Sequence, residues 1–438
     1  MNMDIKKPFA EQFSDKERRR YRRYAICSAV TGCISEWCLD SNTVIILYLV
    51  MLGGSESFSM FSSAISALVT VLLSIPFAGV ANKIGLRISY RAAVFLGMSA
   101  YFLMAAAPFF GAVAKYVVIA GCFIYCFSRP LYSATWYPIC DSFLLKHERG
   151  SFFGNMRFIY MTLNALLIFS AGKLMGAKPP IWIMQLVILF PGLMLFGRKI
   201  CMDNLPVNPA SEKNVYDLKK AIAISVRNSE LMGFSFYICM INMSIAAALP
   251  LAILYMKTTL NFTPFQMMTI TSIGLAGYIS GYAVVGRLMK KIGTRNFQLL
   301  THGIFIVFLA SLFLIQPQWN YLPERFAILF YLHGIGAAFL MCLSSTEMLA
   351  LARPANKLMA SAMVNTFTAL GTTVGRTGGS IILGLALLNE SWNLWGGNFT
   401  KYNALFALSL CMIIFSLLFL LLAPSVVPRH KDYYEPSN

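Results

Sequence analysis

Two carboxylates lie inside an apolar run near the N-terminus, where ionisable groups are rare. Glu36 and Asp40 are four residues apart, so in a helix they share one face, with Trp37 beside them. In another apolar run, Arg129 is expected at a similar depth, and Trp136 lies on the same helical face as Arg129. An ionised group at membrane depth costs about 2.5 to 3.5 kcal/mol on insertion scales, so these groups should face a cavity or one another.

Two carboxylates and one guanidinium leave one acid in excess, and that carboxyl group could bind and release a proton. Alternatively, Glu36 and Asp40, together with Ser41 and Asn42, could supply oxygen ligands to a small cation such as sodium. A purely structural salt bridge is the third interpretation. We predict that Glu36 and Asp40 are the residues that couple transport to a proton or a sodium ion.

A second pair of ionisable residues occurs in the apolar run 326–352. His333 and Glu347 lie on one face of the expected helix, with His333 toward the outside and Glu347 toward the cytoplasm. Histidine titrates near neutrality, so this face could carry protons. A histidine that only hydrogen-bonds a neighbouring helix fits equally well. We include both residues among the candidate coupling groups.

A polar face also runs along the stretch 359–388, where Thr372 and Arg376 alternate with glycines that permit close helix contact. Arg376 has no acidic neighbour of its own half at that depth, so we expect either a carboxylate of the first half or an anionic substrate to reach it. The predicted substrate-binding residues are Arg129, Arg376, Trp37, Trp136, Asn164, Asn242 and Thr372.

The composition shows which elements must position these groups. The chain has 438 residues, of which 58% are hydrophobic and only 12% are charged, with a mean hydropathy of +0.65. A soluble chain is about a quarter charged, so disorder, a coiled coil and an ordinary cytosolic enzyme are excluded. Apolar runs long enough to cross a bilayer occur near 24–51, 58–81, 92–111, 117–143, 153–175, 179–198, 231–256, 265–288, 298–316, 326–352, 359–388 and 402–424. We therefore expect an all-α membrane protein with twelve transmembrane helices.

The distribution of Lys and Arg residues predicts how the chain is oriented in the membrane. The net charge is +18, and most Lys and Arg residues fall in short loops on the same side as the N-terminus. By the positive-inside rule both termini are cytoplasmic, and the basic excess indicates topology rather than binding to nucleic acid. No removable signal peptide is evident.

The longest polar interruption runs from Arg198 to Glu230 and divides the spans into two sets of six. Within it, Val215 to Val226 has apolar residues at helical spacing, which is typical of a helix lying on the inner leaflet, although a solvated linker helix fits nearly as well. The predicted organisation is a basic segment (1–23), a first six-helix bundle (24–198), a linker (199–230), a second bundle (231–424) and a tail (425–438).

The two halves share a basic turn after their second spans. Aligning them places Ala78–Arg87 over Gly286–Arg295, with the sequences AGVANKIGLR and GRLMKKIGTR. The matched turn residues are Lys83, Gly85 and Arg87 in the first half and Lys291, Gly293 and Arg295 in the second, with Asn82 as a further loop position. Matching turns in halves with equal span counts indicate duplication, which is typical of transporters with a midplane substrate site.

This paired turn resembles the loop signature of the major facilitator superfamily. The departures are Ala78 in place of the first glycine, Asn82 in place of the commoner acid, and Lys290 where the second copy would usually be acidic or polar. The resemblance implies two six-helix bundles that rock about a central site, with these seven loop residues acting as gating elements between conformations. An alternative is that the loop cations only determine topology.

No motif for covalent, nucleotide-dependent or metal chemistry occurs, so we predict no enzyme activity, no metal and no cofactor besides a co-transported ion. We expect a secondary active transporter, a symporter coupled to protons or sodium that carries a small polar organic solute, with anionic solutes preferred. Proton-coupled export of drugs or metabolites is the alternative, and a receptor or scaffold is a third class. The expected partners are the lipid bilayer, the solute and the coupling cation, for a monomer in the plasma membrane.

Overall fold

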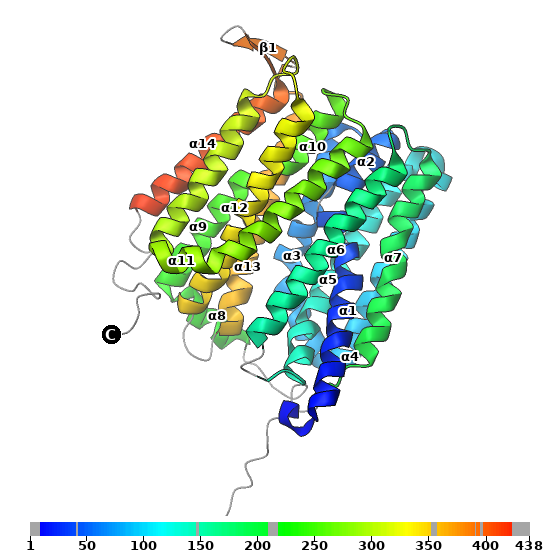
Figure 1. Ribbon diagram of the computed structural model, residues 1–438, viewed down its shortest axis with the longest axis vertical. Coiled ribbons are helices and arrows are strands. Elements are labelled where there is room, and N and C mark those ends of the chain that lie inside the picture. Colours follow the sequence, from blue (N-terminus) through cyan, green and yellow to red (C-terminus); the bar gives the residue numbers. More distant parts are fainter. Residues whose placement is uncertain are drawn as a thin grey trace, which may run out of the picture. The chain divides into compact units, whose positions relative to one another are not determined.

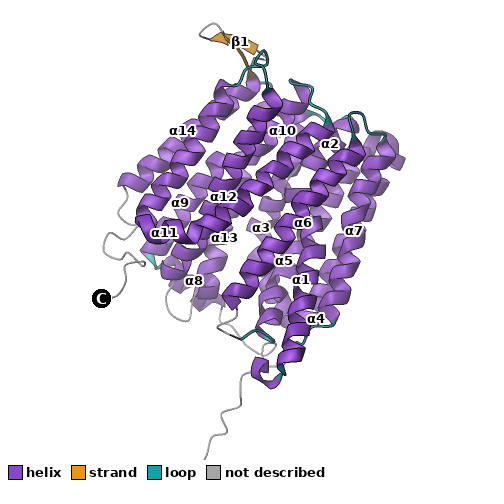
Figure 2. Cartoon of the chain, in the orientation of Figure 1, coloured by secondary structure: helices purple, strands orange, loops and turns teal. Residues whose placement is uncertain are grey.

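The computed structural model describes residues 9–40, 43–145, 149–208, 218–351, 357–389, 391–394 and 397–422 (Figures 1 and 2). Nearly all of these residues are helical. In lipid every backbone N–H and C=O group must be paired within the chain, and long apolar sequences do this most simply as helices. The one sheet in the described chain is the antiparallel hairpin of β1 (Ser391–Leu394) and β2 (Gly397–Thr400), in which Trp392 pairs with Phe399.

The helices, in chain order, are η1 (Phe9–Gln12), α1 (Asp15–Asp40), α2 (Thr43–Met51), α3 (Glu56–Ile84), α4 (Leu86–Ala106), η2 (Ala107–Val113), α5 (Ala114–Asp141), α6 (Arg149–Met175), α7 (Ile181–Asp203), α8 (Leu218–Val226), α9 (Ser229–Ile245), α10 (Ala248–Thr258), α11 (Pro264–Leu314), α12 (Leu322–Leu351), α13 (Lys357–Gly384) and α14 (Lys401–Leu422). Of the predicted linker helix 215–226, the described part begins at Leu218. The C-terminal tail 425–438 lies outside the described residues.

Nine stretches of the described chain are long and apolar enough to cross a membrane. One of them, Leu86–Ser133, contains the predicted span 92–111 and the first part of the predicted span 117–143. The predicted spans 24–51 and 359–388 appear as α1 with α2 and as α13, which are helical but are not among the nine. The chain is therefore a helical multi-pass membrane protein, and the count of twelve spans with cytoplasmic termini stays a prediction.

The chain divides into two compact units. The first unit contains residues 1–40, 72–164 and 181–216, and the second contains 41–71, 165–180 and 217–438. Helix α3 thus contributes its first part to the second unit, and α6 contributes its last part. The units differ from the predicted sequence halves because two segments of the first half pack with helices of the second half. The predicted domain boundaries were placed at polar loops. Such loops indicate where the chain leaves the membrane, but they do not indicate which helices pack together.

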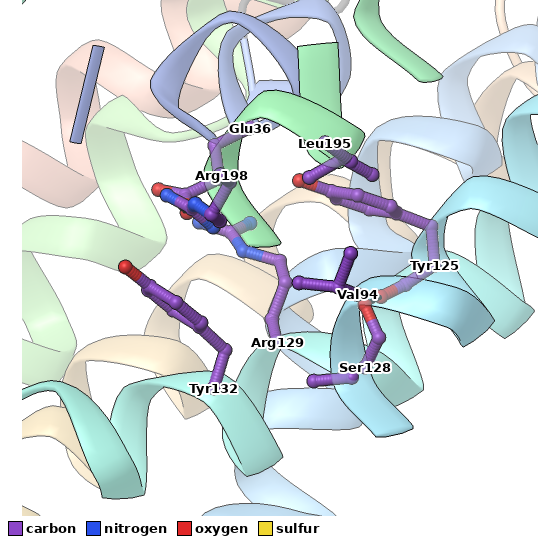
Figure 3. Close-up of a pocket in the computed structure, with 9 residues that line it drawn as sticks. Glu36, Val94, Tyr125, Ser128, Arg129, Tyr132, Leu195 and Arg198 are labelled. Atoms are coloured by element: carbon purple, nitrogen blue, oxygen red, sulfur yellow. Dashed lines mark hydrogen bonds and ion pairs between the residues drawn. The ribbon is translucent and has the colours of Figure 1, made fainter. Parts of the chain in front are cut away.

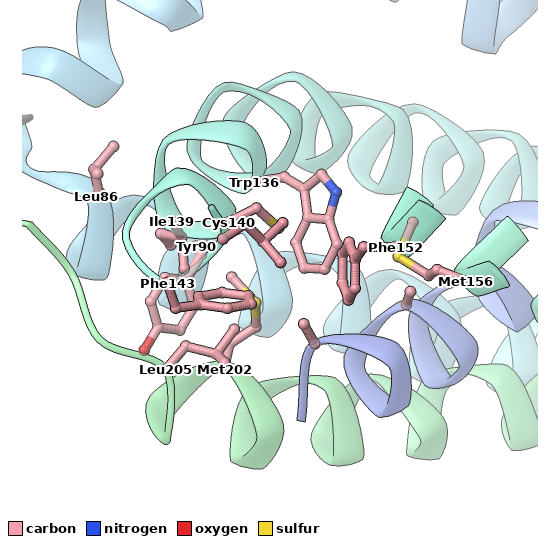
Figure 4. Packing of buried hydrophobic residues seen from close by; sticks show 13 residues of the cluster. Leu86, Tyr90, Trp136, Ile139, Cys140, Phe143, Phe152, Met156, Met202 and Leu205 are labelled. Carbon is pink, nitrogen blue, oxygen red and sulfur yellow. The ribbon is translucent and has the colours of Figure 1, made fainter. Parts of the chain in front are cut away.

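In the first unit, α1 packs against α7, and α4 packs against both α5 and α7. A cluster of buried residues from α1, α4, α5, α6 and α7 joins these helices (Figure 4). Its aromatic members include Tyr90, Trp136, Phe143 and Phe152. Phe143 and Phe152 meet edge to face with ring centroids 6.3 Å apart. This packing holds α1 against α5 and α7, the helices that carry the polar site described below.

In the second unit, α9 packs against α13 and α14, while α11 packs against α12 and α14. Helix α11 begins with a capping box, because Gln266 N donates to Thr263 Oγ1 (3.2 Å) and Thr263 N donates to Gln266 Oε1 (2.9 Å). Helix α2 contacts α10 and α11 (Figure 1). The short helix α2 comes from the first half of the sequence but belongs to this unit.

The duplicated turn has the expected backbone geometry in both copies. Gly85 precedes α4 with a φ of 88°, and Gly293 interrupts α11 with a φ of 75°. Only glycine adopts this conformation without strain, so both turns need a glycine. The turn residues Lys83, Arg87, Lys291 and Arg295 are exposed, while the side chain of Asn82 lies outside the described part.

Candidate functional site

An ion pair between α1 and α7 is the centre of the site. Arg198 Nη2 lies 2.9 Å from Glu36 Oε1, and the exposed fractions of the two side chains are 6% and 26%. Figure 3 shows the Glu36 carboxylate beside the Arg198 guanidinium, with the Arg129 side chain extending toward the same place. Glu36 was predicted from the sequence as a site residue, and the structure gives it a cationic partner from a different helix.

Arg198 is held in place by groups on α1 and α5. Its Nε donates to the backbone oxygen of Ser28 (3.3 Å), and its guanidinium carbon lies 3.9 Å from the centroid of the Tyr132 ring. A guanidinium on an aromatic face gains electrostatic energy and avoids water. Gly32 makes the approach possible, since a Cβ atom there would lie 1.6 Å from Arg198 Cζ. The site thus needs a residue without a side chain one helical turn before Glu36.

Two tyrosines support α1 on the other side of this ion pair. Tyr125 donates from its hydroxyl to Ser35 Oγ (3.2 Å), and the Tyr101 hydroxyl donates to the Ser35 backbone oxygen. The two rings meet edge to face with centroids 5.1 Å apart. Because Tyr101 is on α4 and Tyr125 is on α5, these bonds orient the turn of α1 that carries Glu36.

A small recess with room for about one water molecule opens beside the ion pair. Its polar lining consists of Glu36, Tyr125, Ser128, Arg129, Tyr132 and Arg198, and its apolar lining of Ala93, Val94 and Leu195. Two guanidinium groups and one carboxylate give this lining a formal positive charge. A small anion can be bound there by guanidinium groups, which recognise carboxylates and phosphates through paired N–H donors.

The other predicted residues of the first unit lie in different surroundings. Trp136 is 8% exposed within the apolar cluster and stacks on Tyr132, with ring centroids 5.9 Å apart. It therefore supports a residue that lines the recess. Asn164 is buried, and its amide nitrogen has no hydrogen-bond partner among the described residues. Trp37 and Asp40 lie in α1, but their side chains are outside the described part of the structure.

The sequence analysis missed Arg198 because it ended the sixth span there and treated the residue as the start of a loop. The structure corrects this boundary, since α7 continues to Asp203 and Arg198 is an internal residue of the helix. A cation at the end of an apolar run normally reaches water, so its type and position alone indicated a topology signal. The available hint was Gly32, which lies four residues before Glu36 on the same face of α1.

In the second unit, the Arg376 guanidinium donates hydrogen bonds to backbone carbonyl oxygens. Its Nε donates to the backbone oxygen of Ala246 (3.0 Å), and its Nη1 donates to the backbone oxygen of Ser63. The Ala246 carbonyl needs such a donor because Pro250, four residues later, has no N–H group to offer it. Arg376 therefore stabilises the break between α9 and α10. Its predicted contact with substrate stays a prediction.

The remaining predicted residues of the second unit are dispersed over three helices. His333 is 6% exposed and lies 4.9 Å from the Phe308 ring, while Glu347 is 1% exposed. Asn242 donates to the Ile238 oxygen (2.8 Å) and Thr372 to the Thr368 oxygen (3.0 Å), so each bonds to its own helix. Their assignment to ion coupling or substrate binding stays a prediction.

A polar seam joins α2 and the first part of α3 to helices of the second half, all within the second unit. Thr43 Oγ1 is 3.0 Å from Thr271 Oγ1. Ser57 donates to the Ser380 backbone oxygen (2.8 Å), and Ser380 donates to the Ser57 backbone oxygen (2.8 Å). Lys401 Nζ lies 2.6 Å from Glu56 Oε2. We call these contacts and the Arg376–Ser63 bond the α2–α3 seam.

Within the described residues, no group of three His, Cys, Asp or Glu side chains is placed to hold a metal ion. What the structure offers instead is a helical membrane protein with a buried ion pair beside a recess of positive charge. Ionisable groups kept at membrane depth beside an opening are typical of helical membrane proteins that move solutes or ions.

Comparison with known proteins agrees with this class. The family model described as Major Facilitator Superfamily matches residues 231–436. A search of curated protein sequences finds no match. The chain is similar to a crystal structure of a mutant of the nucleoside transporter NupG, with a TM-score of 0.70 and 13% identity over 92% of this chain and 99% of that chain.

Two further solved structures share the fold. A bacterial homologue of the iron transporter ferroportin in an inward-facing state gives a TM-score of 0.71 at 10% identity, over 92% of this chain and 98% of that chain. The inward-open xylose transporter XylE from E. coli gives 0.64 at 14% identity, over 92% and 95%. The second half of the chain thus matches the model of the major facilitator superfamily, and the chain as a whole shares the fold of these solved membrane transporters.

Proposed function

We propose that the protein is a secondary active transporter that takes up a small anionic organic solute together with a proton. The observation that carries this proposal is the recess lined by Glu36, Arg129 and Arg198, with its formal positive charge. A solute anion that enters the recess meets two guanidinium groups, and it competes with Glu36 for Arg198. In this structure the recess holds about one water molecule, so it must widen to admit a solute.

Competition for Arg198 gives a physical route to coupling. In the ion pair Glu36 faces the Arg198 guanidinium. When a substrate anion takes the guanidinium, the carboxylate loses that partner and can accept a proton, so substrate and proton are carried together. Asp40 is a second candidate coupling carboxylate on the same face of α1, and Arg376 is the candidate contribution of the second half to substrate binding.

The α2–α3 seam supports alternating access. In the predicted topology the segments around Glu56 and Lys401 face the outside, so the seam is a closed outer gate in this proposal. Its hydrogen bonds and the Glu56–Lys401 pair must separate to admit solute from outside. Two similar structures carry the descriptions inward-facing and inward open, and another is described as a D-xylose-proton symporter, which is the mode of coupling proposed here.

The duplicated turns complete the proposal. Gly85 and Gly293 place exposed cations at equivalent points of the two halves, and we assign the turns around them to gating between conformations. The transporter acts as a monomer in the plasma membrane in this proposal, with no cofactor besides the co-transported ion.

Uptake by the purified protein in proteoliposomes tests the function. With an inward proton gradient, we expect accumulation of small carboxylates in preference to sugars, nucleosides and neutral amino acids. Glu36→Gln should abolish accumulation against a gradient but retain exchange of solute, because the binding cations remain. Arg129→Gln should weaken binding of the anion. Arg91→Gln is the matched control, since it removes a half-exposed arginine that pairs with Asp203 and does not line the recess.

Three results would contradict the proposal. Equal transport of neutral and anionic solutes would remove the role of the guanidinium groups. Uptake driven by sodium and indifferent to the proton gradient would replace the coupling ion. Solute movement out of vesicles against proton entry would favour the exporter.

A further inference from the structure

Two free cysteines meet where α1 packs against α7 in the first unit. Cys27 is on α1 and Cys201 is on α7, and neither lines the recess. Their thiol groups are in hydrogen-bond contact. A single cysteine in an apolar helix acts as a small hydrophobic side chain, but two thiols in contact can also react with each other. We call these residues the Cys27–Cys201 pair.

The packing of the two helices places the thiols opposite each other. Thr31 on α1 faces Gly197 on α7, where a Cβ atom would lie 3.2 Å from Thr31 Cγ2. As the first and sixth predicted spans, these helices cross the membrane in opposite directions. One helical turn back from Thr31 is Cys27, and one turn forward from Gly197 is Cys201. The contact of the thiols therefore follows from the register of α1 against α7.

The two thiols differ in their access to solvent. Cys27 is exposed, whereas Cys201 is only 7% exposed. The pair lies near polar ends of both helices, because Arg23, one turn before Cys27, and Asn204, three residues after Cys201, are exposed. A reagent from the aqueous phase thus meets Cys27 first. An accessible thiol beside a second cysteine that can resolve the first product is typical of cysteines that respond to oxidation.

The predicted topology determines the redox conditions that the pair meets. With the N-terminus in the cytoplasm, Cys27 lies at the cytoplasmic end of α1. Thiols are kept reduced in that compartment, and the disulfides that do form there are usually transient and redox-sensing. The pair is therefore reduced under ordinary conditions and becomes oxidised when small disulfides accumulate.

We propose that the Cys27–Cys201 pair is a redox-active site that reacts with a small disulfide, such as oxidised glutathione, and closes into a disulfide between α1 and α7. The Cys27 thiol gives its proton to water, and its sulfur attacks the glutathione disulfide. A Cys27–glutathione bond forms, the original S–S bond breaks, and one glutathione leaves as a thiolate.

The second step closes the site. Cys201 loses its proton and attacks the Cys27 sulfur, so the Cys27–Cys201 bond forms and the second glutathione leaves as a thiolate. In total the two protein thiols lose two electrons and two protons, and one molecule of oxidised glutathione is reduced to two of the thiol form. Reduced glutathione reverses both steps.

The disulfide would lie next to the ion pair of the candidate functional site. Arg198 precedes Cys201 by three residues, and its Nε donates to the backbone oxygen of Ser28 (3.3 Å), the neighbour of Cys27. A covalent bond here ties α1 to α7, the helices that carry Glu36 and Arg198. Since the recess must widen to admit a solute, we expect the bond to reduce uptake. This consequence rests on the proposed function, whereas formation of the disulfide does not.

Mass spectrometry of the full-length protein tests the site without any transport assay. The protein is treated with oxidised glutathione, the remaining thiols are blocked by alkylation, and its peptides are analysed without reduction. We expect the peptides of Cys27 and Cys201 to be recovered as one cross-linked species that dithiothreitol separates. Cys201→Ser should stop the reaction at the mixed disulfide of Cys27 with glutathione. Cys27→Ser should leave the buried Cys201 thiol reduced.

Cys411→Ser is the matched control, because it removes an exposed thiol of α14 in the second unit. It should leave the cross-link unchanged. A mixed disulfide that persists on Cys27 in the unmodified protein, or a bond from Cys27 to a different cysteine, would overturn the site. Cys27→Ser alters an exposed side chain, so it tests the site even where Cys201→Ser folds poorly.

Uptake into proteoliposomes then tests the consequence for transport. Oxidised glutathione should suppress uptake by the unmodified protein, dithiothreitol should restore it, and Cys201→Ser should keep its uptake under both conditions. Equal uptake before and after complete cross-linking would overturn the effect on transport. Because the cross-link is detected without substrate, a failure of the proposed symport is distinguishable from a failure of the site.

Discussion

The two polar centres of this protein are built from different chemistry. The centre on α1 and α7 is ionic, with Glu36 and Arg198 in direct contact beside a recess. In the second unit, Tyr237, Gln298, His302 and Glu347 are each at most 1% exposed, and the Tyr237 hydroxyl lies 3.5 Å from His302 Nδ1. The charged side chains of Glu36 and Arg198 therefore border an opening, whereas the polar residues of the second group are enclosed by packing.

The largest expected effect is the loss of the ion pair. Arg198→Met keeps much of the side-chain volume but leaves Glu36 mostly buried without its guanidinium. Breaking a buried pair typically costs about 3 to 5 kcal/mol, and we expect about 2 to 3 kcal/mol here because Glu36 retains some contact with solvent. Denaturation of the purified protein in detergent measures the change, and uptake should be lost.

The half-exposed pair of Arg91 and Asp203, 2.9 Å apart, is the control for that measurement. Arg91→Met should cost much less than Arg198→Met, as is usual for surface pairs. Adding Glu36→Gln to Arg198→Met should recover part of the lost stability, because the buried charge is then removed. Equal costs for Arg91→Met and Arg198→Met would mean that the first centre is not distinguished by its charge.

A smaller effect is expected from Gly32, which admits Arg198 to the surface of α1. An alanine methyl group there would lie 1.6 Å from Arg198 Cζ, so the guanidinium must move away from Glu36. We expect Gly32→Ala to cost about 1 to 3 kcal/mol, the usual range for overpacking, and to reduce uptake about tenfold or more, equivalent to about 1.4 kcal/mol.

Gly303 on α11 provides the matched substitution, because a Cβ atom there meets nothing within 4 Å. Gly303→Ala should be neutral or stabilise the protein by up to about 1 kcal/mol, since alanine favours the helix. Thermal unfolding and solute uptake of both variants check the pair. Normal uptake by Gly32→Ala would show that Arg198 does not need its place against α1.

The smallest expected effect concerns the buried polar residues of the second unit. Gln298→Leu replaces a buried amide by an apolar group of similar size. If ordered water satisfies the amide, the variant loses about 1 kcal/mol, the net value of ordinary hydrogen bonds. If the site is dry, the substitution stabilises the protein instead. Thermal unfolding distinguishes the two outcomes.

Much of the architecture could be predicted because lipid imposes a simple rule on sequence. Apolar runs must become helices, and the glycines of the repeated turns, Gly85 and Gly293, adopt the left-handed conformation that their position in a tight turn requires. Helix ends were less predictable. The end of α7 was placed five residues early because Arg198 looked like the beginning of a loop.

For the contacts of the candidate site, the sequence predicted one of the two residues but not its partner. A carboxylate in an apolar run identified Glu36, but its partner depends on how α1 and α7 pack, and residues separated by 162 positions cannot be matched by spacing. Arg376 was expected to meet a charge. Its described partners are backbone carbonyls. One of them, the Ala246 carbonyl, lacks its usual helical donor because Pro250 has no N–H group, and Arg376 reaches it only because α13 packs beside the break between α9 and α10.

By itself the sequence determined that this is a helical membrane protein with duplicated turns, because hydropathy and glycine conformation act locally along the chain. Only the tertiary structure decided which polar groups meet, since a buried charge or amide accepts any partner that packing brings within hydrogen-bond distance. That choice paired Glu36 with Arg198, joined His302 to Tyr237, and assigned α2 to the unit formed mainly by the second half.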